Sequence, residues 1–89
     1  MYHVYILKSL NYNRSYVGVT YDLNDRIEKH NLSRVKSTKV YCPWILVHSE
    51  QYSTLSEAKK REWFLKCTPQ GGKLKKKILE MAGMAARRA

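Results

Sequence analysis

Acidic residues, cysteine and long apolar stretches are all scarce in this chain. Seven Asp and Glu stand against seventeen Lys and Arg, which gives a formal net charge of +10 over 89 residues. So strong a field on so small a protein favours a polyanionic partner, nucleic acid before a membrane surface. No apolar run is long enough to span a bilayer, and no charged-then-apolar leader marks the chain for export. We therefore expect a basic cytoplasmic protein that binds nucleic acid.

The few cysteines and histidines do not form a recognisable metal site. Cys42 and Cys67 lie far apart, and two thiols with no other sign of secretion are expected to stay reduced. His3, His30 and His48 are also too dispersed to complete a zinc pattern with them. The sequence therefore predicts no structural metal.

The chain is long enough for one domain with an economical core. Residues 2–7 and 15–20 are rich in Tyr, Val and Ile, which favour strands, and the asparagines of 11–14 favour a turn between them. Asp22 and Thr54 are placed to act as helix N-caps. The other predicted elements are a helix over 23–30, a strand over 44–52, a helix over 55–66, a break over 68–72 and a basic helix over 73–81.

Two tyrosines of the predicted hairpin share a face. Side chains alternate along a strand, so Tyr16 and Gly18 lie on one face of the second strand while Val17 and Val19 lie on the other. A hairpin register can bring Tyr5 of the first strand to the same face as Tyr16. Gly18 then leaves bare backbone beside the two phenols, which makes this face a candidate site.

The predicted helix after the hairpin adds a guanidinium and an imidazole. Arg26 and His30 are four residues apart and lie together on one side of the helix. Arginine offers a planar fork of donors that matches phosphate oxygens, and imidazole ordinarily titrates near neutral pH. If this side of the helix faces the tyrosines, the four groups converge.

Glu62 falls inside the apolar stripe of the predicted helix over 55–66. The same stripe contains Leu55, Ala58 and Leu65. A carboxylate there is destabilising unless a nearby Arg or a divalent cation compensates it. Alternatively, Arg61 or Lys66 draws Glu62 outward into a surface ion pair. The residues alone leave both interpretations open.

Basic and hydroxyl side chains gather in two further segments. Residues 31–42 interrupt the helical pattern and form either a solvated connector or a flap that contacts phosphates. Lys73 opens a lysine-rich run that is either a solvated helix face or an extended basic track. The candidate nucleic-acid contacts are Arg34, Lys36, Ser37, Thr38, Lys39 and Lys73. We expect Trp44 to pack in the core, with base stacking as the alternative.

Taken together, these residues resemble the GIY-YIG nuclease superfamily. The similarity is carried by Val4-Tyr5-Ile6, Tyr16-Val17-Gly18, Arg26, His30, Pro43-Trp44 and Glu62. The first tripeptide departs from Gly-Ile-Tyr but retains its tyrosine. The similarity is strongest to small single-domain bacterial members related to the N-terminal nuclease domain of a DNA-repair excinuclease. The resemblance spans roughly Tyr2 to Lys66 and implies an α+β fold, a small three-stranded antiparallel sheet flanked by helices. We assign the domain to residues 1–81 and expect 82–89, which has little to bury, to be a frayed or disordered tail.

The resemblance also implies a division of labour among the candidate residues. Glu62 would bind one Mg²⁺ or Mn²⁺, an ion that tolerates sparse protein ligation because it keeps several waters. Arg26 would stabilise charge on the phosphate. Tyr5 or Tyr16 would take a proton from the attacking water, although a phenol with a pKa of about 10 needs a cationic neighbour to do so. His30 belongs to the same catalytic group.

Three functions are therefore compared. The first is a metal-dependent endonuclease that acts on DNA, or on RNA, with a place in DNA repair and recognition by structure or backbone rather than by a long base sequence. The second is a non-catalytic module that binds nucleic acid with the same face and shows steep salt dependence. The third is a protein whose basic surface meets an acidic protein partner.

Overall fold

The first strand, β1 (Tyr2–Ser9), forms the centre of the sheet and pairs with both other strands. β2 (Ser15–Thr20) and β3 (Trp44–Tyr52) flank it, so the strand order is β2-β1-β3 and both pairs are antiparallel. The computed structural model describes residues 1–88, with side chains described through residue 82. The strand predicted over 44–52 is confirmed residue for residue.

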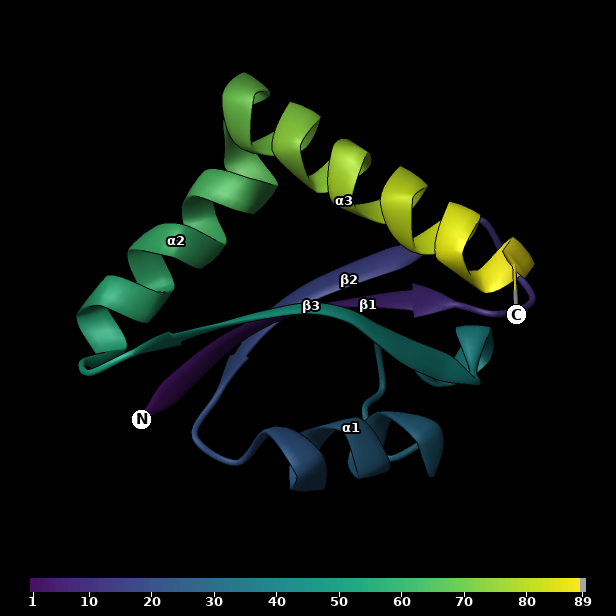
Figure 1. Cartoon of the computed structure of the whole chain (residues 1–89). Coiled ribbons are helices and arrows are strands. Elements are labelled where there is room, and N and C mark those ends of the chain that lie inside the picture. Colours follow the sequence, from purple (N-terminus) through teal and green to yellow (C-terminus); the bar gives the residue numbers. More distant parts are fainter. Residues whose placement is uncertain (89) are drawn as a thin grey trace.

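Helices cover both faces of this sheet. α1 (Leu23–Asn31) lies on one face, and α2 (Leu55–Cys67) and α3 (Pro69–Arg88) lie on the other (Figure 1). A short 3₁₀ helix, η1 (Lys39–Tyr41), interrupts the segment between α1 and β3. The expected α+β fold with a three-stranded antiparallel sheet flanked by helices is therefore confirmed.

Alternation along β1 divides the core into two clusters. Val4 and Ile6 point toward α2 and α3, where they pack with buried residues of those elements and of β2. Tyr5 and Leu7 point the other way, toward α1 and Trp44. These four side chains of β1 are all fully buried, as expected for a central strand. Tyr5 therefore belongs to the core under α1 as well as to the candidate site.

The predicted N-caps of α1 and α2 are both confirmed. The Asp22 carboxylate accepts a hydrogen bond from the Asp25 backbone N–H at 3.1 Å, and the Thr54 hydroxyl accepts one from the Glu57 backbone N–H at 3.2 Å. Each cap satisfies an N–H group that has no partner inside the first helical turn.

The break after α2 is shorter than predicted, and α3 begins at Pro69 rather than at residue 73. Proline is well suited to the first helical position, because its missing N–H has no partner there. Thr68 caps the new helix: its hydroxyl accepts from the Gly71 N–H at 3.0 Å, and its carbonyl accepts from the Gly72 N–H at 2.9 Å. One residue thus ends α2 and starts α3.

None of the helices within residues 1–88 combines the length and the apolar character that crossing a membrane requires. The backbone of α3 is described as far as Arg88. The frayed tail expected over 82–89 lies almost entirely beyond the described side chains, and it stays a prediction.

Candidate active site

The hairpin places two phenols over a glycine. Tyr5 pairs with Gly18 across the strands, and Leu7 pairs with Tyr16, so both tyrosines lie on one face as predicted. Their ring centroids are 6.1 Å apart. A Cβ at Gly18 would lie 2.5 Å from the Tyr5 hydroxyl oxygen and 2.9 Å from a Tyr16 ring carbon. Only glycine lets the phenols lie this close to the strand.

His30 completes a buried hydrogen-bonded chain with Tyr5. The Tyr5 hydroxyl lies 3.0 Å from His30 Nε2, and His30 Nδ1 lies 2.7 Å from the Thr38 hydroxyl oxygen. The Thr38 hydroxyl donates to the Val35 carbonyl at 3.4 Å. It therefore accepts from Nδ1–H, which leaves Nε2 to accept the Tyr5 proton. Thr38 thus sets the tautomer that receives the phenol.

The imidazole of His30 is neutral at physiological pH. Burial, and then the positive charge of Arg26, lower its pKa from 6.5 to about 4. The expectation of titration near neutral pH is therefore wrong, because the helix turns this side chain into the core rather than toward solvent. A neutral ring can accept a hydrogen bond from Tyr5, which an imidazolium cannot.

Arg26 lies beside both phenols. Hydrogen bonding to Tyr5, and more weakly to Tyr16, raises the pKa of Arg26. Burial raises the pKa of Tyr5 to about 12, although the neighbouring Arg26 opposes the change. Tyr5 therefore keeps its proton across the physiological range. Tyr16, which is half-buried, is the more open of the two phenols.

Glu62 of α2 lies near this cluster. Its negative charge contributes to the raised pKa of Tyr5, which places it within electrostatic range of the phenol pair. The Glu62 side chain is 27% exposed and pairs with Lys66, with an N–O distance of 3.5 Å. The Lys66 ammonium in turn lies 5.5 Å from the centre of the Tyr16 ring. Glu62 therefore lies near the candidate site, and its carboxylate forms the ion pair with Lys66 that the alternative interpretation of the sequence expects.

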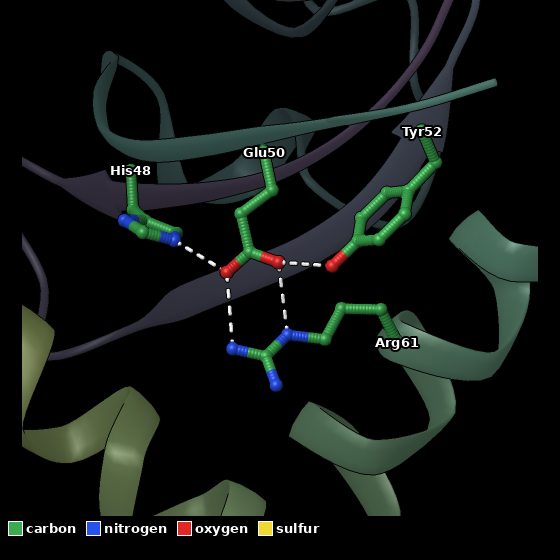
Figure 2. Close-up of polar contacts among 4 residues, drawn as sticks. All are labelled: His48, Glu50, Tyr52 and Arg61. Carbon is green, nitrogen blue, oxygen red and sulfur yellow. Dashed lines mark hydrogen bonds and ion pairs between the residues drawn. The ribbon is translucent and has the colours of Figure 1, made fainter.

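On the other side of α2, Arg61 is anchored to β3. Its guanidinium donates two hydrogen bonds to Glu50, at 2.9 and 3.1 Å, and the same carboxylate accepts from His48 at 2.7 Å and from Tyr52 at 2.6 Å (Figure 2). Burial alone would raise the pKa of Glu50, but these hydrogen bonds together lower it to about 2. The polar side chains at alternate positions 48, 50 and 52 of β3 were the sequence signal for this network.

The Arg61 anchor fixes which way α2 faces. The buried residues of the helix are Ala58 and Leu65. At 100° per residue, Arg61 and Glu62 lie on opposite flanks of that buried seam. Because Arg61 is held at β3, Glu62 is directed toward β2 and the tyrosines.

Five of the six predicted nucleic-acid contacts are exposed, namely Arg34, Lys36, Ser37, Lys39 and Lys73. Thr38 is different, because it is only 2% exposed and its hydroxyl is used by His30. It is therefore not available to a phosphate in this structure. Trp44 packs in the core as predicted, at 4% exposure, and its indole N–H donates to the Thr38 carbonyl at 3.0 Å.

Glu62 is the residue of this cluster that suits a divalent cation. Within the part of the chain whose side chains are described, no three His, Cys, Asp or Glu side chains gather where they could hold a metal ion. A lone half-buried carboxylate is a hard oxygen donor that fits Mg²⁺ or Mn²⁺, since Mg²⁺ keeps several waters. The ion pair between Glu62 and Lys66 is long and partly exposed, so it is weak enough for a divalent cation to displace the ammonium group.

Acid should weaken the fold through His30. The folded pKa of about 4 lies below the ordinary value of 6.5, so the unfolded chain takes up the proton first as pH falls. The contribution of His30 to stability is complete above the ordinary pKa of 6.5, and it is lost as the pH falls toward the folded pKa of about 4. The free energy of unfolding should be about 2 kcal/mol lower at pH 5 than at pH 7.5. Urea denaturation at the two pH values measures this difference.

The matched variants for this experiment are His30→Asn and His3→Asn. His30→Asn should remove most of the difference between the two pH values, because asparagine does not titrate. His3→Asn should preserve that difference. A wild-type stability that is the same at both pH values, or an unchanged difference in His30→Asn, would contradict the assignment of a buried neutral imidazole.

Comparison with known proteins assigns the chain to a family. The sequence profile of the GIY-YIG catalytic domain family matches residues 1–75. UPF0213 proteins from Staphylococcus aureus strains Mu3 and Mu50 are each 44% identical to the chain over 73 residues, which cover 81% of this chain and 88% of each relative. No solved structure matches the chain. The small hairpin domain with its two tyrosines therefore belongs to the GIY-YIG catalytic domain family.

Proposed function

We propose that this domain is a divalent-metal-dependent endonuclease that hydrolyses phosphodiester bonds in DNA. Membership in the family implies a nuclease-type activity on nucleic acid; the metal, the choice of DNA over RNA, and a role in DNA repair in the cytoplasm belong to the proposal. The observation that supports it is the position of Arg26 beside two phenols, with Glu62 close enough for its charge to contribute to the raised pKa of Tyr5.

In the proposed reaction, Arg26 binds the phosphate and Tyr16 is the general base that takes a proton from the attacking water. The planar guanidinium would contact nonbridging oxygens and stabilise the charge that develops on them in the transition state. Tyr16, the more open phenol, would act in its phenolate form, having first released its own proton to solvent. The positive charge of Arg26 beside it would stabilise this form, which would then accept the proton of the water. This choice between the two tyrosines follows from burial, because Tyr5 is fully buried.

Tyr5 and His30 would then have a positioning role. Tyr5 keeps its proton and donates a hydrogen bond to the neutral ring of His30, whose tautomer Thr38 fixes. The rings of Tyr16 and His30 are 4.9 Å apart, so the same imidazole also supports the second phenol. A divalent cation held by Glu62 would neutralise charge on the phosphate and on the leaving oxygen.

Exposed cations around α1 and at the start of α3 would hold the nucleic-acid backbone. Arg34, Lys36 and Lys39 follow α1, and Lys73 lies in the first turns of α3. Contacts of this kind bind phosphates without reading base sequence. They support recognition by the shape of the substrate rather than by a long sequence.

A non-catalytic nucleic-acid-binding module is the second candidate. The observation that favours it is the pair between Glu62 and Lys66, in which an ammonium group already offsets the charge of the carboxylate. If Lys66 keeps this position in the complex, the same surface would bind nucleic acid without cutting it. Steeply salt-dependent binding without cleavage would identify this function.

A panel of labelled substrates tests the proposal. Nicked, flapped, branched and single-stranded DNA, with RNA counterparts, should be cleaved only when Mg²⁺ or Mn²⁺ is supplied and not in EDTA. Arg26→Ala should lower the cleavage rate by about 100-fold or more, because it removes charge stabilisation in the transition state. Products are resolved on denaturing gels.

The control variant is Lys29→Ala on the same helix. Lys29 pairs with Asp25 on the exposed surface, so its removal should leave the cleavage rate within about threefold of the wild type. Equal cleavage by wild type and Arg26→Ala would indicate a contaminating nuclease and refute the proposal.

A further inference from the structure

The outer surface of α2 presents an exposed tryptophan. Trp63 is 61% exposed, whereas Trp44 is 4% exposed in the core. Tryptophan is highly buried on average, so an indole on an open helix surface points to a contact made with another molecule. In Figure 1, α2 lies at one end of the molecule. The side of the helix that carries its buried residues packs against the sheet.

Trp63 borders a shallow hollow on this surface. The hollow has a volume of about 860 Å³, and its lining residues are Leu55, Ser56, Lys59, Lys60, Trp63 and Phe64. This volume falls within the range of roughly 300–1,000 Å³ that is usual for ligand-binding clefts. Phe64 forms part of the floor, because it packs against the core beneath α2. The surface can therefore receive a flat apolar group larger than a side chain.

The charge of the hollow indicates what kind of partner fits it. The surface of the hollow is mostly apolar, Lys59 and Lys60 are among its lining residues, and none of the lining residues carries a carboxylate. An apolar protein surface would gain nothing from these two ammonium groups, whereas an acidic partner with flat rings would contact both the lysines and the indole. Unpaired nucleotides have these two properties together, phosphates along the backbone and bases that stack on aromatic side chains.

The position of Trp63 connects this hollow to the proposed active site. Trp63 directly follows Glu62 in α2, and Lys59 lies one turn before it. A strand that leaves the site past Glu62 would therefore pass over the indole and the neighbouring lysine.

We infer that the hollow around Trp63 binds the unpaired strand of a partly single-stranded nucleic acid, with a base stacked on the indole and phosphates near Lys59 and Lys60. The inference rests on the proposed function in taking nucleic acid as the substrate. It adds that the preferred substrate joins a duplex to an unpaired strand.

Binding without cleavage gives the direct test. Fluorescein-labelled DNA is titrated in EDTA with full-length protein, using a blunt duplex and the same duplex with an unpaired ten-nucleotide overhang. Trp63→Ala should weaken binding of the overhang by about tenfold and of the blunt duplex by less than about twofold. Trp63→Phe retains an aromatic face and should stay within about threefold of the wild type.

Three outcomes would overturn the inference. The first is equal weakening of both DNAs in Trp63→Ala, and the second is no weakening of either. The third is a wild-type dimer that Trp63→Ala converts to a monomer with DNA binding unchanged, which would assign the hollow to a second copy of the chain. Thermal melting of each variant confirms that it is folded.

Cleavage assays separate this inference from the proposed function. A wild type that binds overhangs through Trp63 but never cuts them would refute the endonuclease and keep the hollow as a binding site. A wild type that cuts overhangs at the same rate and the same KM as Trp63→Ala would keep the endonuclease and remove the hollow from it.

Discussion

Replacing Glu62 with glutamine should lower the rate of phosphodiester cleavage about a thousandfold, because the proposed metal ligand would lose its charge. Glutamine has nearly the same shape, so the packing of α2 beside Ala58 and Leu65 should not change. Nucleic-acid affinity should be retained or rise slightly, since a negative charge is removed from a basic surface. Single-turnover cleavage on denaturing gels gives the rate, and fluorescence anisotropy gives the affinity.

Glu57→Gln is the matched control for this prediction. Glu57 lies on the same helix and is exposed at its first turn, so the variant makes the same chemical change away from the site. Its cleavage rate should stay within about twofold of the wild type. If both glutamine variants cleaved at the wild-type rate, Glu62 would not be the metal ligand, and the cleavage would belong to other residues or to a contaminating nuclease.

The hairpin and its two tyrosines can be predicted from the sequence because strand periodicity is a local property. Alternation alone assigns Tyr5 and Tyr16 to one face, and the register Leu7–Tyr16 agrees with it. The N-caps Asp22 and Thr54 are local in the same way. What alternation does not reveal is depth: it assigns both phenols to one face, but only packing under α1 shows that Tyr5 is fully buried while Tyr16 is not.

The groups that support the site depend on contacts distant in sequence. In the sequence, Thr38 is a hydroxyl residue in a basic loop. Only the fold turns its side chain inward, where it sets the tautomer of His30. The sequence offers Arg61 as a partner for Glu62, yet Arg61 binds Glu50, which is eleven residues earlier in the chain. Helical periodicity places Glu62 and Arg61 near the buried stripe. Which of the two lies toward β3 is decided by the hydrogen bonds between Arg61 and Glu50.

Replacing Gly71 with alanine should lower the free energy of unfolding by about 3 kcal/mol, because α2 and α3 meet at this residue without room for a side chain. A Cβ there would collide with the backbone carbonyl of Phe64 and lie 2.9 Å from the Cα of Leu65. Backbone atoms inside a helix cannot move aside as the end of a side chain can, so α3 would have to shift. In a domain whose total stability is of the order of 5–15 kcal/mol, such a loss is large.

The neighbouring glycine provides the control for this prediction. A Cβ at Gly72 meets nothing within 4 Å, and alanine favours a helix over glycine by about 0.5–1 kcal/mol. Gly72→Ala should therefore stabilise the domain by up to that amount, so that two adjacent and identical substitutions change stability in opposite directions. Urea denaturation of both variants beside the wild type measures the difference. If Gly71→Ala were as stable as Gly72→Ala, the close approach of α3 to the end of α2 would not exist in solution.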